Sequence, residues 1–384
     1  MMISSRAKEI NPSATLKITA EIKKLKKEGR KVINFAGGEP DFDTPSKIKE
    51  SAKKAIDSGF TKYTPVAGIS ELREKICQKI KEWYSLDYKP EQIVVSNGAK
   101  HAIFNSLYVL LDPGDEVLIF SPYWVSYPEM VKLCSGKPVI VDFKETDEFH
   151  PDLDLIKSKI TKKTKCIILN SPCNPTGVVW RKEELVMLAE VAVEHNIFII
   201  SDEIYSRLIY DSQHFSIAGL GKEIQARTIT INGVSKTYSM TGWRIGWSCS
   251  PSEIAREIAK IQGQITSNAC SISQMAALSA LSLEKYEIEK MREIFKNRRD
   301  ILIAGLKKLG LNFITPQGAF YLFLKVSNLG YTSFDFAKKF LTQKLVGVIP
   351  GKPFGNDEYV RISYAISQEE IEEGLKRLGE FISG

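Results

Sequence analysis

The sequence lacks the residue patterns of several large functional classes. Its six cysteines include no Cys-X-X-Cys pair, which is typical of a protein in a reducing cytoplasm. Its four histidines show no zinc-ligand spacing, so no metal is expected. No apolar run approaches the length that spans a membrane, and the N-terminus lacks the apolar core of a signal peptide. Lysine, tyrosine, aspartate and arginine are left to carry any catalysis in a protein expected to be cytoplasmic.

Positive charge is mild and spread along the chain. The formal net charge is +7, and no block of basic residues is set apart as a nucleic-acid arm. The densest basic stretch, residues 23–31, is interleaved with glutamates and follows apolar positions on one helical face, which indicates a solvated amphipathic helix. The sequence therefore predicts anionic small-molecule substrates, with neither nucleic acid nor membrane as a partner.

Length and periodicity predict the fold class. With 384 residues, 43% of them hydrophobic, the chain fits two domains, one of which can be split in sequence. Short apolar runs alternate with helical patterns such as residues 182–194, which predicts an α/β fold with a mostly parallel central sheet. The runs cover residues 92–96, 116–121, 165–170, 196–202 and 228–232. Ligands bind beyond the carboxyl ends of such strands, so the residues after each run are candidate site residues.

The first three runs end in groups suited to a planar anionic ligand. Gly98, Ala99 and Lys100 form a small-residue turn before a helix, where free N–H groups can bind a phosphate; an ordinary strand-to-helix turn has the same pattern. Trp124 is placed either to stack on a ring or to pack in a core. Two prolines bend the loop around Asn174, which aims its amide into the site.

The last two runs supply titratable groups. Asp202 follows a strongly apolar strand, which indicates either a helix cap or a buried carboxylate with a cationic partner, and Tyr205 is close behind it. Lys236 and Arg244 occupy a glycine-bracketed segment that offers one ligand an amine nucleophile and a phosphate clamp. Together the strand ends match the needs of a phosphorylated pyridine aldehyde, so the sequence predicts pyridoxal 5′-phosphate (PLP) as cofactor.

A series of short motifs then runs in order over nearly the whole chain. They lie at residues 37–42, 63–65, 68–73, 121–124, 170–177, 201–205, 235–246, 317–321 and 360–364. They resemble those of class I aminotransferases of the aspartate aminotransferase fold, and most closely the bacterial aspartate aminotransferase branch. The resemblance implies PLP fold type I, with a large PLP-binding domain at residues 46–281 and a smaller α+β domain made of residues 1–45 and 282–384.

The resemblance implies three catalytic residues. Lys236 would bind the cofactor aldehyde through its amine and then move the proton between the substrate Cα and the cofactor C4′. Asp202 would keep the pyridine nitrogen protonated, and Tyr205, with Asn174, would bond the phenolate oxygen. The chemistry needs a neutral Lys236 amine, and nearby positive charge with restricted solvation would lower its pKa.

Further cofactor contacts follow from the same resemblance. Arg244, with the backbone of residues 98–100, would bind the phosphate, and Trp124 would stack on the ring. Tyr63 would reach the phosphate of the partner subunit, which implies a homodimer with shared active sites. Gly233 stands where many relatives carry a phosphate-binding serine, so one phosphate contact is lost or supplied elsewhere.

The resemblance also places substrate-binding residues. Arg361 would clamp the α-carboxylate in two bonds beside Trp124 and Asn174, although strand alternation over residues 359–363 suits an exposed arginine equally well. Gly38 would let the backbone approach the same carboxylate.

Substrate choice depends on two more positions. Lys100 and Thr15 match positions near the distal carboxylate in the bacterial branch, although a solvated lysine and a helix N-cap explain them equally well. We expect amino acids and 2-oxo acids as small-molecule partners, with transfer of the amino group of L-aspartate to 2-oxoglutarate to give oxaloacetate and L-glutamate. Aromatic or prephenate aminotransferases with a broader substrate range, and PLP lyases on the same fold, share these motifs.

Overall fold

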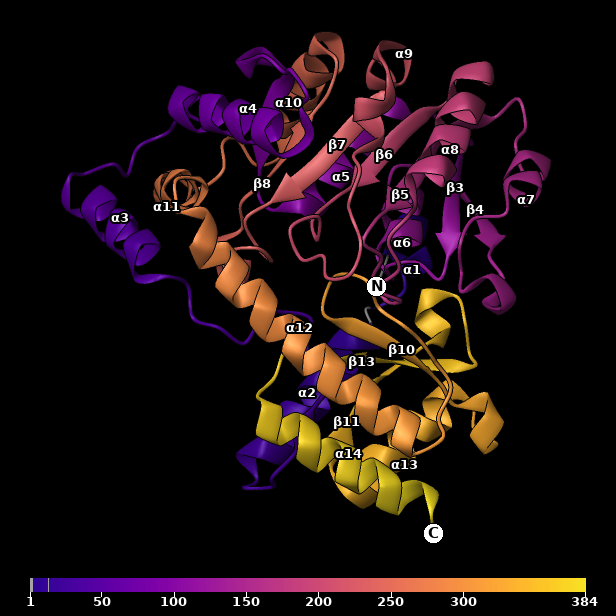
Figure 1. Ribbon diagram of the computed structural model, residues 1–384. Coiled ribbons are helices and arrows are strands. Elements are labelled where there is room, and N and C mark those ends of the chain that lie inside the picture. The colour runs from indigo at the N-terminus through magenta and orange to yellow at the C-terminus, as the bar shows by residue number, and fades with distance from the viewer. Residues whose placement is uncertain (1–2, 13) are drawn as a thin grey trace.

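A seven-stranded sheet forms the centre of the larger part of the protein, whose computed structural model describes residues 3–12 and 14–384 (Figure 1). The strand order is β2-β8-β7-β6-β5-β3-β4, and β8 alone runs antiparallel to its neighbours. The strands are β2 (Ile93–Ser96), β3 (Glu116–Ser121), β4 (Lys137–Asp142), β5 (Thr164–Asn170), β6 (Phe198–Asp202), β7 (Thr228–Gly233) and β8 (Gly246–Cys249).

Helices cover both faces of this sheet, and the central strands are apolar for that reason. Residues 166–169 of β5 and 199–200 of β6 are buried without a polar alternation, as expected for parallel strands enclosed on both sides. The helices are α3 (Ser46–Asp57), α4 (Ser70–Tyr84), α5 (Ala99–Leu110), α6 (Tyr127–Leu133), α7 (Leu153–Ser158), α8 (Lys182–Glu194), α9 (Lys222–Gln225), α10 (Ser252–Ile265) and α11 (Ser271–Leu281).

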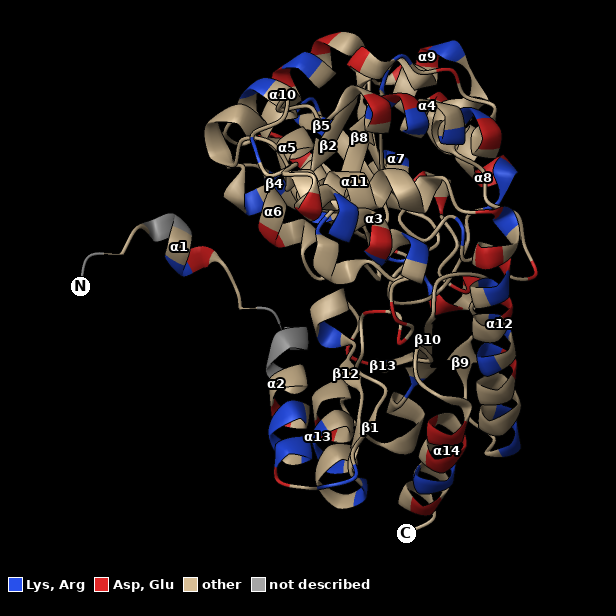
Figure 2. Ribbon diagram, turned by 90° about the vertical axis from the view of Figure 1, so that its left-hand side faces the viewer, with Lys and Arg blue, Asp and Glu red and all other residues tan. Residues whose placement is uncertain are grey.

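The smaller part combines the two ends of the chain. Its antiparallel sheet has the order β12-β13-β10-β9, and a separate parallel pair joins β1 to β11. The strands are β1 (Ile33–Asn34), β9 (Phe313–Ile314), β10 (Tyr321–Lys325), β11 (Val346–Gly347), β12 (Ile349–Pro350) and β13 (Tyr359–Ser363). The helices are α1 (Ser5–Glu9), α2 (Ala14–Lys27), α12 (Lys285–Lys308), α13 (Ser333–Lys344) and α14 (Gln368–Ile382). In Figure 2, α1 lies apart from the rest of the chain.

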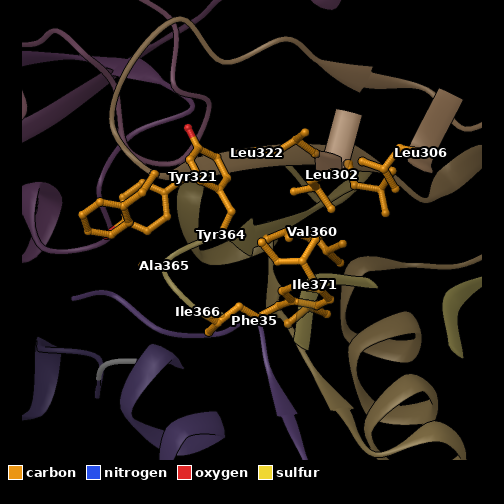
Figure 3. Packing of buried hydrophobic residues seen from close by; sticks show 14 of the residues in the cluster. Phe35, Leu302, Leu306, Tyr321, Leu322, Val360, Tyr364, Ala365, Ile366 and Ile371 are labelled. Atoms are coloured by element: carbon orange, nitrogen blue, oxygen red, sulfur yellow. The ribbon is translucent and has the colours of Figure 1, made fainter. Parts of the chain in front are cut away.

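A hydrophobic core holds the smaller part together. Phe35 of the N-terminal segment packs in one buried cluster with Leu302 of α12, Val360 of β13 and Ile371 of α14 (Figure 3). The polypeptide therefore cannot form this core from its C-terminal third alone.

The predicted fold class is confirmed, since the sheet is α/β and mostly parallel. Each predicted apolar run is a strand, with ends that differ by at most two residues, while β4 and β8 were not predicted. All strands of the large sheet lie within residues 46–281, and all those of the smaller part lie outside that range. The domain boundaries themselves stay a proposal. Within residues 3–12 and 14–384, no helix has the length and apolar character needed to cross a bilayer.

Candidate active site

A cavity of about 470 Å³ lies between the large sheet and the smaller part of the protein. Asn170 and Asp202 end strands β5 and β6 at this cavity, and Lys236 reaches it from the loop after β7. Gly38 and Arg361 line it from the smaller part. The strand-end prediction therefore holds, because residues from three neighbouring strands meet at one sheet edge.

Lys236 lines this cavity with an amine of unusual surroundings. Its Nζ donates a hydrogen bond to the carbonyl of Gly38 at 2.6 Å. Burial, and next the positive charge of Arg361, lower the pKa of Lys236 to about 8. Deprotonation at mildly alkaline pH makes this amine a far better nucleophile than a surface lysine.

Asp202 is a buried carboxylate, 3% exposed, at the end of β6. Tyr127 donates its hydroxyl proton to Oδ2 at 2.7 Å, and the N–H of Ile204 donates to Oδ1 at 3.2 Å. Burial raises the pKa of Asp202 to about 6 despite these bonds. A cationic ring nitrogen placed in the cavity would favour the ionised form again, because opposite charges lower a carboxyl pKa.

Arg361 is buried, at 3% exposure, which excludes the alternative of an ordinary exposed strand arginine. Its Nη1 donates to Asn174 Oδ1 at 2.9 Å, its Nη2 donates to the carbonyl of Ala36 at 3.2 Å, and its guanidinium lies 4.3 Å from the ring centre of Tyr321. Among the described residues its hydrogen-bond partners are an amide and a carbonyl, neither of them a carboxylate, and its Nε has no hydrogen-bond partner. A buried guanidinium without a counter-charge is suited to an anionic ligand.

The start of α5 and Arg244 form a cradle for an anion. Gly98 is the N-cap of α5 with φ of +88°, and Ala99 and Lys100 line the cavity just after it. The guanidinium of Arg244 donates to the carbonyl of Asn97 at 3.3 Å. A Cβ on Gly98 would lie 2.5 Å from Arg244 Nη2, so only glycine allows this approach. Helix N–H groups and a guanidinium together suit a phosphate.

Trp124 and Lys100 occupy the same wall of the cavity. The ammonium of Lys100 lies 4.8 Å from the centre of the Trp124 ring, and that ring meets Tyr127 edge-on at 5.3 Å. Trp124 is therefore at the site and not in a distant core. Lys100 also remains exposed to solvent, so its position fits both a ligand contact and a solvated lysine.

Tyr205 and Asn174 reach the cavity, but they bond to protein groups. The hydroxyl of Tyr205 lies 3.0 Å from that of Tyr321, and Asn174 uses its oxygen to accept from Arg361. Asn174 Nδ2, which faces no acceptor in these bonds, is the atom left for a ligand oxygen.

Two predicted residues are not placed in this cavity. Tyr63 is 91% exposed and does not line it, so its expected contact with a partner subunit stays a prediction. The side chain of Thr15 lies outside the described residues. At Gly38 an added Cβ would meet only the Tyr321 hydroxyl at 3.8 Å, so a steric need for glycine there requires the ligand itself.

The space around Gly233 explains why this chain has no phosphate-binding serine at that position. A Cβ at this position would lie 2.9 Å from the carbonyl of Ile245 and 3.0 Å from Gly246 Cα. Strand β8 is therefore too close for any side chain, and a serine could not be accommodated without moving that strand.

Sequence reasoning missed Tyr127, Tyr321 and Glu39 as cavity residues. The Glu39 carboxylate accepts from the hydroxyl of Thr241 at 2.7 Å, which joins the smaller part to the segment that carries Lys236. Glu39 and Tyr321 lie within recognised motifs, which was a usable signal. The contact between Tyr127 and Asp202 crosses 75 positions, and no local pattern marks it.

The donor set fits PLP. An amine of lowered pKa, a buried carboxylate and a glycine-lined anion cradle lie around one cavity, and an unpaired guanidinium is left for a second anion. These groups match the aldehyde, ring nitrogen and phosphate of the cofactor and the carboxylate of an amino acid.

Comparisons with known proteins agree with this chemistry. The family model for aminotransferase class I and II matches residues 30–378. The chain is 44% identical to aspartate aminotransferase of Bacillus subtilis, with 100% of this chain and 99% of that protein covered. It is 41% identical to aspartate/prephenate aminotransferase of Thermus thermophilus, with 99% and 98% covered. The solved structure of the Thermus thermophilus aspartate aminotransferase with maleate superimposes with a TM-score of 0.96 at 41% identity, covering 99% of both chains. The chain therefore belongs to the class I and II aminotransferases, a PLP-dependent family of enzymes.

Proposed function

We propose that the chain transfers the amino group of L-aspartate to 2-oxoglutarate, giving oxaloacetate and L-glutamate. The observation that carries the proposal is that two cations, Arg361 and Lys100, line the same cavity as Lys236. Arg361 is buried without a carboxylate partner among the described residues, and Lys100 lines the same cavity. One cation suits the α-carboxylate and the other the distal carboxylate of a dicarboxylic amino acid.

Five residues would hold the cofactor by its separate groups. Arg244 and the N-terminus of α5 would bind the phosphate, Trp124 would cover a face of the ring, and Asp202 would bond the ring nitrogen. Asn174 Nδ2 and the hydroxyl of Tyr205 would bond the ring oxygen. When bound, PLP supplies an aldehyde that takes up the amino group and a protonated ring that accepts electrons.

Lys236 would act as the base and acid at the substrate Cα. Its pKa of about 8 leaves part of the population neutral at physiological pH, so the amine can take a proton and return it at a neighbouring carbon. The Gly38 carbonyl accepts from its Nζ and thereby limits where the amine can lie. Arg361 would fix the substrate by the carboxylate, which keeps the Cα proton within reach of Lys236.

Asp202 would hold a proton on the ring nitrogen. Its burial makes an isolated negative charge unfavourable, and the Tyr127 hydroxyl keeps the carboxylate oriented. The pairing is therefore strongest when the ring carries a positive charge, which is the form the reaction needs.

A homodimer with shared active sites belongs to the same proposal, as does a cytoplasmic location. Tyr63 fits the dimer, because its ring is 91% exposed and is therefore available to a second subunit. Its loop is firmly held: the buried Gln274 accepts from the Ile69 N–H at 2.8 Å and donates to Thr64 Oγ1 at 2.9 Å. Such a rigid display suits a contact with a second subunit.

A broader enzyme that also accepts prephenate or aromatic substrates is the second candidate. The name of the Thermus thermophilus relative includes prephenate. Trp124 and Val125 give one wall of the cavity an apolar surface against which a ring could pack.

A half-reaction tests the proposal. PLP-loaded protein is mixed separately with aspartate, glutamate, phenylalanine and alanine, and conversion of the cofactor absorbance to that of its amine form is followed. Fast conversion by aspartate and glutamate alone supports the dicarboxylate enzyme. Comparable conversion by phenylalanine supports the broader enzyme, and no cofactor band contradicts both.

A further inference from the structure

A group of polar side chains is buried behind the cavity without lining it. Glu203 directly follows Asp202, and because side chains alternate along an extended chain, it points away from the cavity. It is 1% exposed and absent from the cavity wall. A carboxylate so far removed from water requires partners, and the chemistry above gives this one no role.

Three side chains surround the Glu203 carboxylate. The hydroxyls of Ser201 and Ser216 donate to Oε1 at 3.0 and 2.7 Å, and Nε2 of His214 lies 3.2 Å from Oε2. The other ring nitrogen of His214, Nδ1, is buried without a hydrogen-bond partner among the described residues. Of the two ring nitrogens of His214, Nε2 is therefore the one that bonds the Glu203 carboxylate.

The backbone of Glu203 continues the connection toward the segment that carries Lys236. The carbonyl of Glu203 accepts from the Ser206 N–H at 2.9 Å. Asn232 Nδ2 donates to Ser206 Oγ at 3.1 Å, and Asn232 Oδ1 accepts from the N–H of Gly233 at 2.8 Å. Gly233 ends β7 and begins the loop to Lys236, where β8 leaves no space for adjustment. The ends of β6 and β7 are thus linked by polar bonds on the side away from the cofactor.

We propose that Glu203 and His214 are a positioning pair that holds the ends of β6 and β7 in the register at which Asp202 and Lys236 face one ligand. The proposal rests on the proposed aminotransferase function. Neither residue touches the cavity, so both act through Asp202 and, by way of Ser206 and Asn232, through the Lys236 loop. A small displacement of either catalytic group would cost much of the rate, because proton transfer depends steeply on distance.

The charge of Glu203 gives the pair a measurable signature. The titratable and charged groups around it are Asp202 and Arg207 on its own segment, His214, Tyr84, Tyr88 and Cys249. A nearby negative charge raises the pKa of acids and of cations alike. Removing it while keeping the side-chain shape is therefore expected to move the titration of the bound cofactor to lower pH.

A second buried histidine–glutamate pair provides the control. His150 Nδ1 lies 2.9 Å from Glu184 Oε1, with side-chain exposures of 8% and 9%, and neither residue lines the cavity. We compare Glu203→Gln with Glu184→Gln in the PLP-loaded full-length protein. The measurements are the pH midpoint of the cofactor's visible absorbance, the dissociation constant for PLP, and kcat and KM for aspartate.

Glu203→Gln is expected to lower the absorbance midpoint, to weaken PLP binding and to reduce kcat by roughly tenfold or more, with a smaller change in KM. Glu184→Gln is expected to match the wild type in all of these and to lose thermal stability at most. If Glu203→Gln behaves like Glu184→Gln, the pair is only structural and the proposal is overturned.

A second variant tests the proposal in case Glu203→Gln does not fold. Ser206→Ala keeps the Glu203 charge and removes the link to Asn232, so it is expected to lower kcat and leave the midpoint unchanged; wild-type kcat in this variant overturns the proposal. A wild-type protein that binds PLP but transfers no amino group overturns the proposed function instead, and the midpoint comparison still tests the pair.

Discussion

Arg361 Nη1 donates to Asn174 Oδ1 at 2.9 Å, although the two residues are 187 positions apart in the sequence. Arg361 belongs to β13 of the smaller sheet, and Asn174 lies in the loop after β5 of the large one. A change in the relative position of the two sheets therefore alters the proposed substrate carboxylate site and the proposed ring-oxygen contact together. The following predictions concern residues on both sides of this connection.

Lys236→Met is expected to abolish amino transfer and to stabilise the apoprotein at neutral pH. The pKa of Lys236 is lowered from 10.5 to about 8, so between these values the unfolded chain binds more protons and folding stability rises with pH. The destabilising contribution is full below about pH 8 and is lost toward pH 10.5. Thermal unfolding of both apoproteins from neutral to alkaline pH checks this, and a difference that does not shrink with pH contradicts it.

Asp202→Asn is expected to reduce kcat by orders of magnitude without destabilising the apoprotein at neutral pH. The pKa of Asp202 is raised from 3.8 to about 6, so the folded chain binds more protons over that range and stability falls as pH rises through it. Replacing the carboxyl by an amide removes this pH-dependent loss of folding stability, which amounts to about 3 kcal/mol at most. Urea unfolding at pH 7 and at pH 4 measures it; a variant less stable than the wild type at both pH values contradicts the sign.

Arg361→Lys is expected to lower kcat/KM for all amino acids by roughly 10- to 100-fold, since an ammonium cannot reproduce two parallel bonds to a carboxylate. The effect should be similar for aspartate and alanine. Steady-state kinetics with both donors measures it, and a loss confined to aspartate would place the α-carboxylate elsewhere.

Lys100→Ala is expected to impair dicarboxylates selectively. The ammonium lies over Trp124 at the cavity wall, where a distal carboxylate could meet it. We expect a loss of about 1 to 2 kcal/mol in kcat/KM for aspartate and little change for alanine. Arg361→Lys serves as the control with uniform losses, and equal losses for both donors in Lys100→Ala would remove the proposed role.

Gly98→Ala is expected to weaken PLP binding strongly, because the new Cβ would displace the Arg244 guanidinium. Gly29→Ala is the matched control: it also replaces a glycine of positive φ, at +80°, but its Cβ would meet nothing within 4 Å. Both variants should lose some stability from backbone strain. Titration of the apoproteins with PLP separates them, and equal PLP affinities would contradict the cradle.

The sequence predicted the elements whose signals are local. Strands β3, β5 and β6 are continuous apolar runs, whereas β4 is an edge strand with exposed ends and β8 alternates Gly246 and Ser248 with Trp247 and Cys249. The sequence of β8 therefore has no continuous apolar run that would mark it as a strand.

The site residues also divide into those marked by a local signal and those that depend on packing. Lys236, Asp202 and Asn174 were predictable because they follow strands that share one sheet edge. The burial of Arg361 was not predictable, because its strand pattern is the same for an exposed arginine. Only the packing of its guanidinium against Tyr321 distinguishes the two cases. The bond from Tyr127 to Asp202 joins segments 75 positions apart, and periodicity does not report it. The Glu203–His214 contact spans only 11 positions, but it depends on how the loop after β6 folds back, which periodicity does not report either.

The pairing of β1 with β11 has a consequence for biosynthesis. Ile33 lies beside Val346, and the N–H of Ser363 donates to the carbonyl of Phe35 at 2.8 Å. On the ribosome, every strand of the large sheet is synthesised before these partners exist. Phe35 of the N-terminal segment therefore stays exposed to solvent until the last strand has been synthesised. We expect chaperones to bind this segment during translation.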